Sequence, residues 1–252
     1  MAKKKTKQPA KLQEALVLFK YILNLFGCKD LAALSGDLKD PVLEVVDDEG
    51  CSRMFHALKK YLYTGVGINE QELREYDRHI VKYTKEINER RTEKITWKYY
   101  QYLALLFTEI YLDRYFTDKM RLLDDINCFL VDEFNFRPET WHEMPQFTDD
   151  DLNKLAFWCA TGSGKTLMLH VNIKQYLYYA EKHHAKKLNR ILILTPNEGL
   201  SNQHIQELKA SGFYAELFNK QGQGGLFGGK QTVEVIDINK LADTDGDKTV
   251  AI

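Results

Sequence analysis

The sequence predicts an α/β fold, with a parallel sheet in the second half of the chain and an α-helical region before it. Three observations support this fold class. After residue 150, apolar runs of strand length alternate with helical segments, which is typical of a parallel sheet covered by helices. Before residue 95, apolar residues recur at spacings of three and four, which indicates amphipathic helices. A glycine-containing turn joins the first predicted strand to its helix.

The N-terminal region is predicted to contain three helices. The first covers residues 12–26, and Gly27 follows it as a C-cap. The second covers residues 51–63. Asn69 and Glu72 have the spacing of a capping box, so we expect a third helix to begin there.

The polar segment at residues 89–94 breaks the third helix, and we expect a domain boundary there. Residues 1–95 then form an α-helical N-terminal region, and residues 96–252 form the domain that contains the sheet. This domain opens with the strongest helical pattern of the first half, at residues 97–116.

The second half of the chain alternates between the two kinds of element. In chain order, the predicted segments are a loose stretch at 117–151, a strand at 155–159, a helix from 165 to about 182, a strand at 191–194, a helix at 200–209, and strands at 213–218 and 232–238. The strand at 155–159 is apolar throughout, which predicts burial on both faces at the centre of the sheet.

The turn after this strand contains the residues predicted to bind phosphate. Gly162 and Gly164 allow the backbone to approach a phosphate group, and the N-terminus of the following helix favours an anion. Lys165 is placed to contact the β and γ phosphates, and the hydroxyl of Thr166 is placed to bind the Mg²⁺ that bridges them. The sequence therefore predicts that the chain binds a nucleoside triphosphate. The alternative is a glycine-rich turn between a strand and a helix that binds no nucleotide.

Two other stretches resemble functional motifs, and we interpret both as structural. Asp132 and Glu133 follow an apolar run but precede the phosphate-binding turn, so we expect an acidic turn after a short helix or strand. Residues 224–230, GGLFGGK, match the spacing of a phosphate loop, but Gln231 stands where Ser or Thr is needed and a strand follows instead of a helix. We expect a surface loop there.

Composition excludes several classes of protein. The chain has 252 residues, of which 44% are hydrophobic and 28% charged, as in globular proteins. No apolar run approaches the roughly 20 residues of a membrane helix. The four cysteines include no C-x-x-C pair, which argues against zinc binding and a disulfide framework and fits a cytoplasmic location. The formal net charge of −1 neither favours nor excludes nucleic acid.

Several motifs resemble a known family. They are ATGSGKT at 160–166, ILILTPNEGL at 191–200, SNQHIQEL at 201–208, and a Tyr-Tyr-Gln helix upstream. Together they resemble the first RecA-like domain of a superfamily 2 helicase or translocase of the DEAD/DEAH type, most closely the restriction subunit of type III restriction enzymes. The resemblance covers about residues 96–252. One departure is Cys159, where the phosphate-loop pattern usually begins with Gly or Ala.

The resemblance implies roles for individual residues. The nucleotide motif comprises Ala160, Thr161, Gly162, Ser163, Gly164, Lys165 and Thr166. Thr195 and Pro196 fall on the motif that contacts the sugar-phosphate backbone of nucleic acid. The alternative is that Thr-Pro merely ends a strand. Gln101 falls where the family has a glutamine that binds adenine, with Tyr99 and Tyr100 available to stack on a base. The alternative is that Gln101 is a solvent-facing helix residue.

The function implied by the resemblance is that of an ATP-dependent motor, with ATP and Mg²⁺ as cofactors and the backbone of duplex DNA as partner. We expect the chain to be the N-terminal part of such a motor in a restriction or phage-defence system, with a specificity or methyltransferase subunit as a further partner. No Asp-Glu-x-His box follows Thr166 and the chain stops at an apolar KTVAI, so we expect a truncated chain that hydrolyses ATP poorly alone. The alternatives are an RNA helicase and a nucleotide-gated regulatory module without motor activity.

Overall fold

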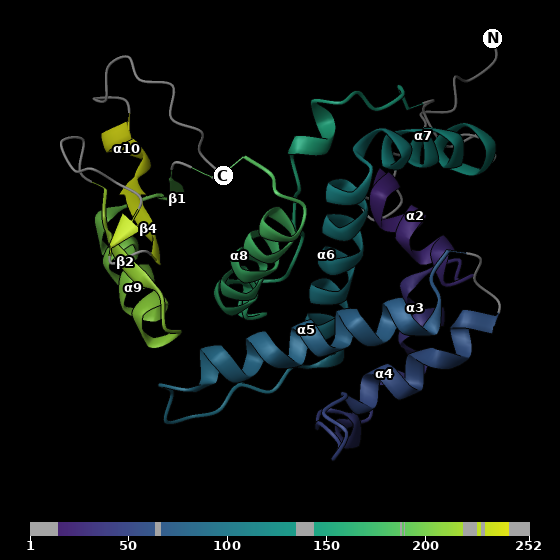
Figure 1. Cartoon of the computed structure of the whole chain (residues 1–252), viewed down its shortest axis with the longest axis horizontal. Helices are drawn as coiled ribbons and strands as arrows, with labels where there is room; N and C mark the ends of the chain where they lie inside the picture. Colours follow the sequence, from purple (N-terminus) through teal and green to yellow (C-terminus); the bar gives the residue numbers. More distant parts are fainter. Residues whose placement is uncertain are drawn as a thin grey trace, which may run out of the picture. The chain divides into compact units, whose positions relative to one another are not determined.

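The computed structural model describes residues 15–63, 67–134, 144–186, 188, 190–218, 226–227 and 230–241. The fold is mixed α/β and mostly helical, as the sequence predicts (Figure 1). The chain forms two compact units. The first comprises Met1–Arg78 and Trp97–Ser163, and the second comprises His79–Thr96 and Gly164–Ile252.

The first unit is helical. Its helices are α2 (Val17–Leu25), α3 (Leu31–Ser35), α4 (Arg53–Leu58), the first half of α5 (Glu70–Asn88), α6 (Tyr99–Thr117) and α7 (Lys119–Phe129). Single turns lie between them: η1 (Gly36–Leu38), η2 (Pro41–Leu43), η3 (Lys59–Tyr63), η4 (Leu130–Phe134) and η5 (Asp151–Asn153). The helices predicted at 12–26, 51–63 and 97–116 are therefore confirmed over their described residues.

Local caps set the ends of these helices. At the end of α2, Gly27 has φ 67°, and its N–H donates to the carbonyl oxygen of Asn24 at 2.8 Å. At the start of α5, the N–H of Asn69 donates to Glu72 Oε2 at 2.8 Å, and the N–H of Glu72 donates to Asn69 Oδ1 at 2.9 Å. These two reciprocal bonds confirm the predicted capping box.

A buried carboxylate joins three helices of the first unit. Asp77 on α5 accepts hydrogen bonds from the Ser52 hydroxyl (2.5 Å), from the Ser52 N–H (2.8 Å) and from the Tyr102 hydroxyl (2.6 Å). Burial raises the pKa of Asp77, and the bonds from Ser52 and Tyr102 oppose that rise. Ser52 is also the N-cap of α4 and accepts from the N–H of Phe55. The network therefore fixes α4 and α6 against α5.

The prediction of a loose stretch at residues 117–151 is wrong for its first part. Asp118 caps α7 by accepting from the N–H of Arg121 at 3.0 Å, and Leu122, Ile126 and Phe129 bury one face of this helix. Helical spacing of apolar residues is sufficient here for a stable helix. Asp132 and Glu133 lie in η4, directly after α7, which confirms the predicted acidic turn.

A small parallel sheet forms the centre of the second unit. The strands β1 (Ile191–Thr195), β4 (Lys230–Asp237) and β2 (Tyr214–Leu217) are parallel and lie in the order β1-β4-β2, while β3 (Leu226–Phe227) pairs antiparallel with β4. The helices of this unit are α8 (Lys165–Lys182), α9 (Glu198–Ala210), α10 (Ile238–Leu241) and the second half of α5. The alternation predicted from residue 165 onward is confirmed.

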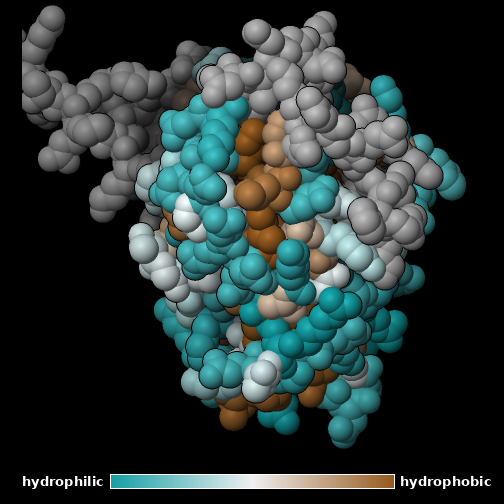
Figure 2. Space-filling model, turned by 90° about the vertical axis from the view of Figure 1, so that its left-hand side faces the viewer, coloured by the Kyte–Doolittle hydropathy of each residue, from teal (hydrophilic) through white to brown (hydrophobic). Residues whose placement is uncertain are grey.

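The core of the second unit lies between the sheet and its helices. Ile193 and Val235 are register partners on neighbouring strands, and they belong to one apolar cluster with Ile173 of α8 and Ile205 and Leu208 of α9. Helix α9 runs along the sheet (Figure 1). Figure 2 shows the side of the molecule that carries the sheet and α9, where a band of apolar surface lies between hydrophilic side chains.

The strand predicted at residues 155–159 is wrong. These residues form no strand, and Phe157 and Trp158 are 42% and 77% exposed. An apolar run indicates a tendency to be buried, but a strand also needs a neighbour that accepts its backbone hydrogen bonds. In the described part of the sheet, β1 pairs with β4 and not with this segment.

Two further sequence features can be placed. The surface loop predicted for GGLFGGK is wrong for its described residues, because Leu226–Phe227 form β3 and Lys230 begins β4; its four glycines lie outside the described residues. Among the helices of the described residues, none combines the length and the apolar character needed to cross a membrane.

Candidate functional site

Two glycines in the left-handed region shape the turn before α8. Gly162 has φ 76° and Gly164 has φ 81°, a conformation that side chains with a Cβ rarely adopt. The N–H of Ser163 donates to the carbonyl oxygen of Ala160 at 3.2 Å, which closes the turn. Ala160 and Thr161 are exposed. The chain passes from the first unit to the second between Ser163 and Gly164.

The helix that follows begins with the predicted phosphate-binding residues. Lys165 and Thr166 form its first two positions, and the N–H groups of Leu167 and Met168 both donate to the carbonyl oxygen of Gly164. Lys165 is exposed and Thr166 half-buried. The N-terminus of an 18-residue helix carries a positive partial charge, so it favours an anion at this position.

Ser163 has a buried hydroxyl. Its side chain is largely inaccessible, and its Oγ makes no hydrogen bond within the part of the chain that the structure describes. A buried polar oxygen of this kind needs a partner to offset its lost hydration. A phosphate oxygen bound in the turn would supply that partner.

Gln101 on α6 binds the same turn. Its Nε2 donates to the carbonyl oxygen of Ser163 at 2.9 Å, and its Oε1 accepts from the N–H of Lys98 at 2.8 Å. The structure thus brings Gln101 to the turn predicted to bind phosphate, 62 residues away along the chain. A glutamine amide has two donor hydrogens and two acceptor lone pairs, so one of each is left for a ligand.

Thr195 lies at the C-terminal end of β1 and is 2% exposed. Its hydroxyl lies 2.6 Å from Ser201 Oγ and within hydrogen-bonding distance of the carbonyl oxygens of Asn197 (3.2 Å) and Ile236 (3.3 Å). These bonds hold the turn between β1 and α9. Pro196 follows on the exposed side of the turn, at the start of α9.

Three residues near Thr195 have no role in the motifs recognised from sequence. Asp237 is the register partner of Thr195 at the end of β4. The amide nitrogen of Asn239 donates to the carbonyl oxygen of Pro196 at 3.3 Å, and Lys240 forms a 2.8 Å ion pair with Glu198. Parallel strands bring their C-terminal ends to one sheet edge, where α/β proteins bind ligands, so the polar residues after β4 could have been identified from that rule.

Buried polar groups lie deeper along α8. His170 is fully buried, and its Nδ1 lies 2.8 Å from Ser211 Oγ at the end of α9. Burial and, to a smaller extent, the positive charges of Arg91 and Lys174 together lower the pKa of His170 to about 3. Burial also lowers the pKa of His204 on α9, while the Glu207 carboxylate opposes that shift. His170 is therefore neutral over the physiological pH range.

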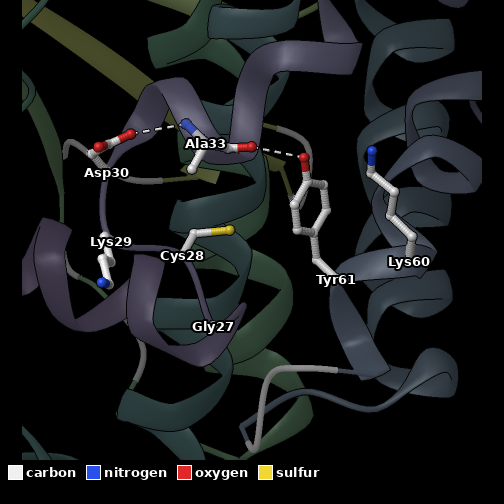
Figure 3. A pocket seen from close by; sticks show the side chains of 7 residues that line it. All are labelled: Gly27, Cys28, Lys29, Asp30, Ala33, Lys60 and Tyr61. Carbon is white, nitrogen blue, oxygen red and sulfur yellow. Dashed lines mark hydrogen bonds between the residues drawn. The ribbon is translucent and has the colours of Figure 1, made fainter.

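A separate hollow of about 560 Å³ lies in the first unit (Figure 3). In Figure 3 the Cys28 side chain points into the space between the start of α3 and Tyr61. The Tyr61 hydroxyl closes one side by donating to the carbonyl oxygen of Ala33 at 2.7 Å. Burial raises the pKa of the Cys28 thiol, so this group is not an activated nucleophile. The hollow contains no residue of the predicted motifs.

The described residues assemble no group of three or more His, Cys, Asp or Glu side chains that could hold a metal ion. The hydroxyl of Thr166 is the predicted contact for Mg²⁺, and an ion at that position would be held jointly with the phosphates of a nucleotide.

Comparison with known proteins gives one match. No curated protein and no solved structure matches the chain. The family model described as "Type III restriction enzyme, res subunit" matches residues 70–245 and so includes α8, β1, α9 and the turn at 160–166. The match supports a helicase-type ATPase module with a RecA-like fold. The chain therefore belongs to the family of type III restriction enzyme res subunits.

Proposed function

We propose that the chain binds Mg-ATP through residues 160–166 and is the N-terminal part of an ATP-dependent DNA translocase or helicase in a restriction or phage-defence system. The observation that carries the proposal is the turn itself. Two glycines with positive φ stand directly before the N-terminus of α8, with Lys165 and Thr166 in its first turn. Left-handed glycines before a helix N-terminus form the backbone geometry that surrounds phosphates.

The remaining side chains have roles consistent with that ligand. Lys165 would neutralise the β and γ phosphates, and Thr166 would bind Mg²⁺ beside them. The Ser163 hydroxyl, which has no partner among the described residues, fits a phosphate oxygen. Gln101 would hold the turn through Ser163 and offer its remaining donor and acceptor to adenine.

Nucleic acid would bind at the C-terminal edge of the sheet. Because the Thr195 hydroxyl is bonded inside the turn, we propose that Thr195 shapes this contact and that Pro196 and the exposed first turn of α9 make it. Backbone contacts of this kind position a strand without reading its sequence, so we assign the partner as duplex DNA on the family membership alone.

The first test is binding of Mg-ATP by the Lys165→Ala variant. Removing one charged contact to phosphate weakens binding by about 10-fold to 100-fold, because a charge-assisted hydrogen bond contributes roughly 1.5–3 kcal/mol. The matched control is Lys209→Ala, an exposed lysine on α9 in the same unit. Equal affinities for the wild type, Lys165→Ala and Lys209→Ala would reject the nucleotide site.

The second test separates a motor from a binding module. ATP hydrolysis is measured with and without duplex DNA, single-stranded DNA and RNA. Hydrolysis stimulated by duplex DNA supports the translocase, and stimulation by RNA alone supports an RNA helicase. Tight Mg-ATP binding with no hydrolysis under any of these conditions supports a nucleotide-gated module.

A further inference from the structure

Arg91 joins two elements of the second unit. It lies in the link after α5, and its side chain is 15% exposed. Its Nη2 donates to Glu207 Oε2 (2.9 Å), to the Glu207 carbonyl oxygen (3.3 Å) and to Ser211 Oγ (2.8 Å). A guanidinium beside the last carbonyl groups of α9 is also favoured by the helix dipole. Through these hydrogen bonds, Arg91 holds the segment 89–96 against the C-terminal end of α9.

Ser211 links Arg91 to α8 through hydrogen bonds. Its hydroxyl accepts from Arg91 and lies 2.8 Å from His170 Nδ1, and both Ser211 and His170 are at most 1% exposed. A hydroxyl oxygen has two lone pairs and one hydrogen, so Ser211 can bond to both side chains whichever ring nitrogen of His170 carries the proton. A continuous series of hydrogen bonds then runs from Arg91 through Ser211 to α8.

A second contact from the same segment reaches α8 one turn further on. Glu86 on α5 forms a 2.7 Å ion pair with Lys174, four residues after His170. The Lys174 ammonium also lies 5.0 Å from the centre of the ring of Phe213, three residues after the end of α9 at Ala210. The segment 79–96 is therefore bonded both to α8 directly and to α8 through α9.

We propose that Arg91 is a positioning residue of the nucleotide site, because it fixes α8 against α9 and thereby sets where Lys165 and the first-turn amides of α8 stand. The inference rests on the proposed binding of Mg-ATP by residues 160–166. His170 is five residues from Lys165, about 7.5 Å along the helix axis, so a shift at His170 is transmitted to Lys165 almost without loss.

Apolar packing alone would not fix this position as sharply. The cluster of Ile173, Ile205 and Leu208 resists separation of the helices, but apolar contacts are not directional and tolerate small slides. Buried hydrogen bonds keep their strength only over a narrow range of distance and angle. The Arg91 network therefore specifies one register of α8 against α9.

The test uses the full chain with Arg91→Ala, Arg91→Lys and the control Arg90→Ala. Arg90 is the neighbouring residue and is exposed. We expect Arg91→Ala to weaken the binding of a fluorescent ATP analogue with Mg²⁺ by about tenfold, which corresponds to about 1.4 kcal/mol. Arg90→Ala leaves binding unchanged. Arg91→Lys recovers part of the affinity, because an ammonium can still donate to Ser211 or Glu207.

Hydrogen exchange without nucleotide is the second readout. We expect faster exchange of the amides in the first two turns of α8 in Arg91→Ala than in Arg90→Ala, with the sheet strands unchanged. A merely structural role would instead lower protection throughout the second unit. Ser211→Ala removes the hydroxyl that links Arg91 to His170 and is a smaller change. It should reproduce the effect on exchange if Arg91→Ala does not fold.

Two results would overturn the inference. One is equal ATP affinity in Arg91→Ala and Arg90→Ala. The other is that the losses of ATP affinity caused by Arg91→Ala and Ser211→Ala add up in the double variant, because residues of one hydrogen-bond network must be energetically coupled. If the wild type and Lys165→Ala bind the analogue equally, the proposed function fails instead, and exchange in α8 alone then decides whether Arg91 orders that helix.

Discussion

Gly162 contributes to the candidate site through its backbone alone. A Cβ added at Gly162 would meet no atom within 4 Å, so space does not require a glycine there. The φ of 76° does, because the left-handed conformation costs other residues about 1–2 kcal/mol. The sequence analysis explained this glycine by close approach of the backbone to a phosphate, and the structure adds a positive φ as a second reason for it.

Gly162→Ala should weaken Mg-ATP binding by about tenfold, because the strain of the left-handed alanine opposes the bound shape of the turn. Gly36→Ala is the matched control, since a Cβ at Gly36 also meets open space but its φ of −51° is helical. Titration with a fluorescent ATP analogue measures both. Equal affinity for both variants would contradict this reading of the turn.

His170 should make folding stability depend on pH. Burial lowers its pKa to about 3, whereas the unfolded residue titrates near its ordinary value of 6.5. Between these values the unfolded chain binds a proton that the folded chain does not. The contribution of His170 to the free energy of unfolding is therefore fully present above pH 6.5. It falls as the pH drops toward 3, by up to about 1.4 kcal/mol per pH unit.

The variant His170→Asn should lose this part of the pH dependence, and its amide can still bond to Ser211 because it occupies the place of Nδ1. His184→Asn is the control, because His184 is exposed and has a φ of 52° that asparagine tolerates. Denaturant unfolding between pH 4 and 8, a range of about four units around the ordinary histidine pKa, measures the slopes. An unchanged slope in His170→Asn would show that other groups cause it.

At the scale of elements, polar networks as well as apolar faces decide how the helices of the first unit fit together. Helix α6 shows this, because apolar residues lie around nearly its whole circumference. Its sequence pattern therefore does not predict which of its faces contacts which neighbouring helix. Tyr102 on α6 and Ser52 at the start of α4 both bond to Asp77 on α5. A single carboxylate thus sets the register of both helices against α5.

Asp77→Ala should lower the free energy of unfolding by about 3 kcal/mol or more, because it leaves the Ser52 N–H and the Tyr102 hydroxyl buried without an acceptor. Glu75→Ala, an exposed position on the same helix, should change it by less than about 0.5 kcal/mol. Denaturant melts followed by circular dichroism compare the two. A loss in Asp77→Ala no larger than in Glu75→Ala would reject the network as a determinant of stability.

For the whole molecule, α5 is the helix that belongs to both compact units. Its residues up to Arg78 lie in the first unit and those from His79 lie in the second. The family match begins at residue 70, at the first residue of this helix. The division into residues 1–95 and 96–252 stays a prediction, and the contacts of Arg91 support counting residues 79–96 with the unit that contains the sheet.

Interrupting α5 at this point should affect both units. Arg78 is exposed, so Arg78→Ala should be nearly neutral, whereas Arg78→Pro removes a helical hydrogen bond and costs about 3 kcal/mol or more. Hydrogen exchange should rise around Asp77 in the first unit and around Lys174 in the second. Faster exchange in only one unit would show that the two halves of α5 form independently.

The sequence alone determined the features that depend on neighbouring residues. The glycine-containing turn at 160–164, the capping box of Asn69 and Glu72, and the start of α8 at Lys165 all follow from backbone conformation and bonds within a few residues. The alternation of strands and helices predicted a parallel sheet, because parallel strands are usually connected through a helix, but it did not predict that β1 pairs with β4.

The tertiary structure alone decided which distant groups meet. Gln101 reaches Ser163 over 62 residues and Arg91 reaches Ser211 over 120, and the residue types of these pairs are too common to identify their partners. Because sequence does not identify distant partners, the prediction of a strand at residues 155–159 was wrong, and the burial of the Thr195 hydroxyl was not foreseen. A sequence pattern states which residues tend to be buried, whereas the partner of a hydrogen bond depends on where the rest of the chain lies.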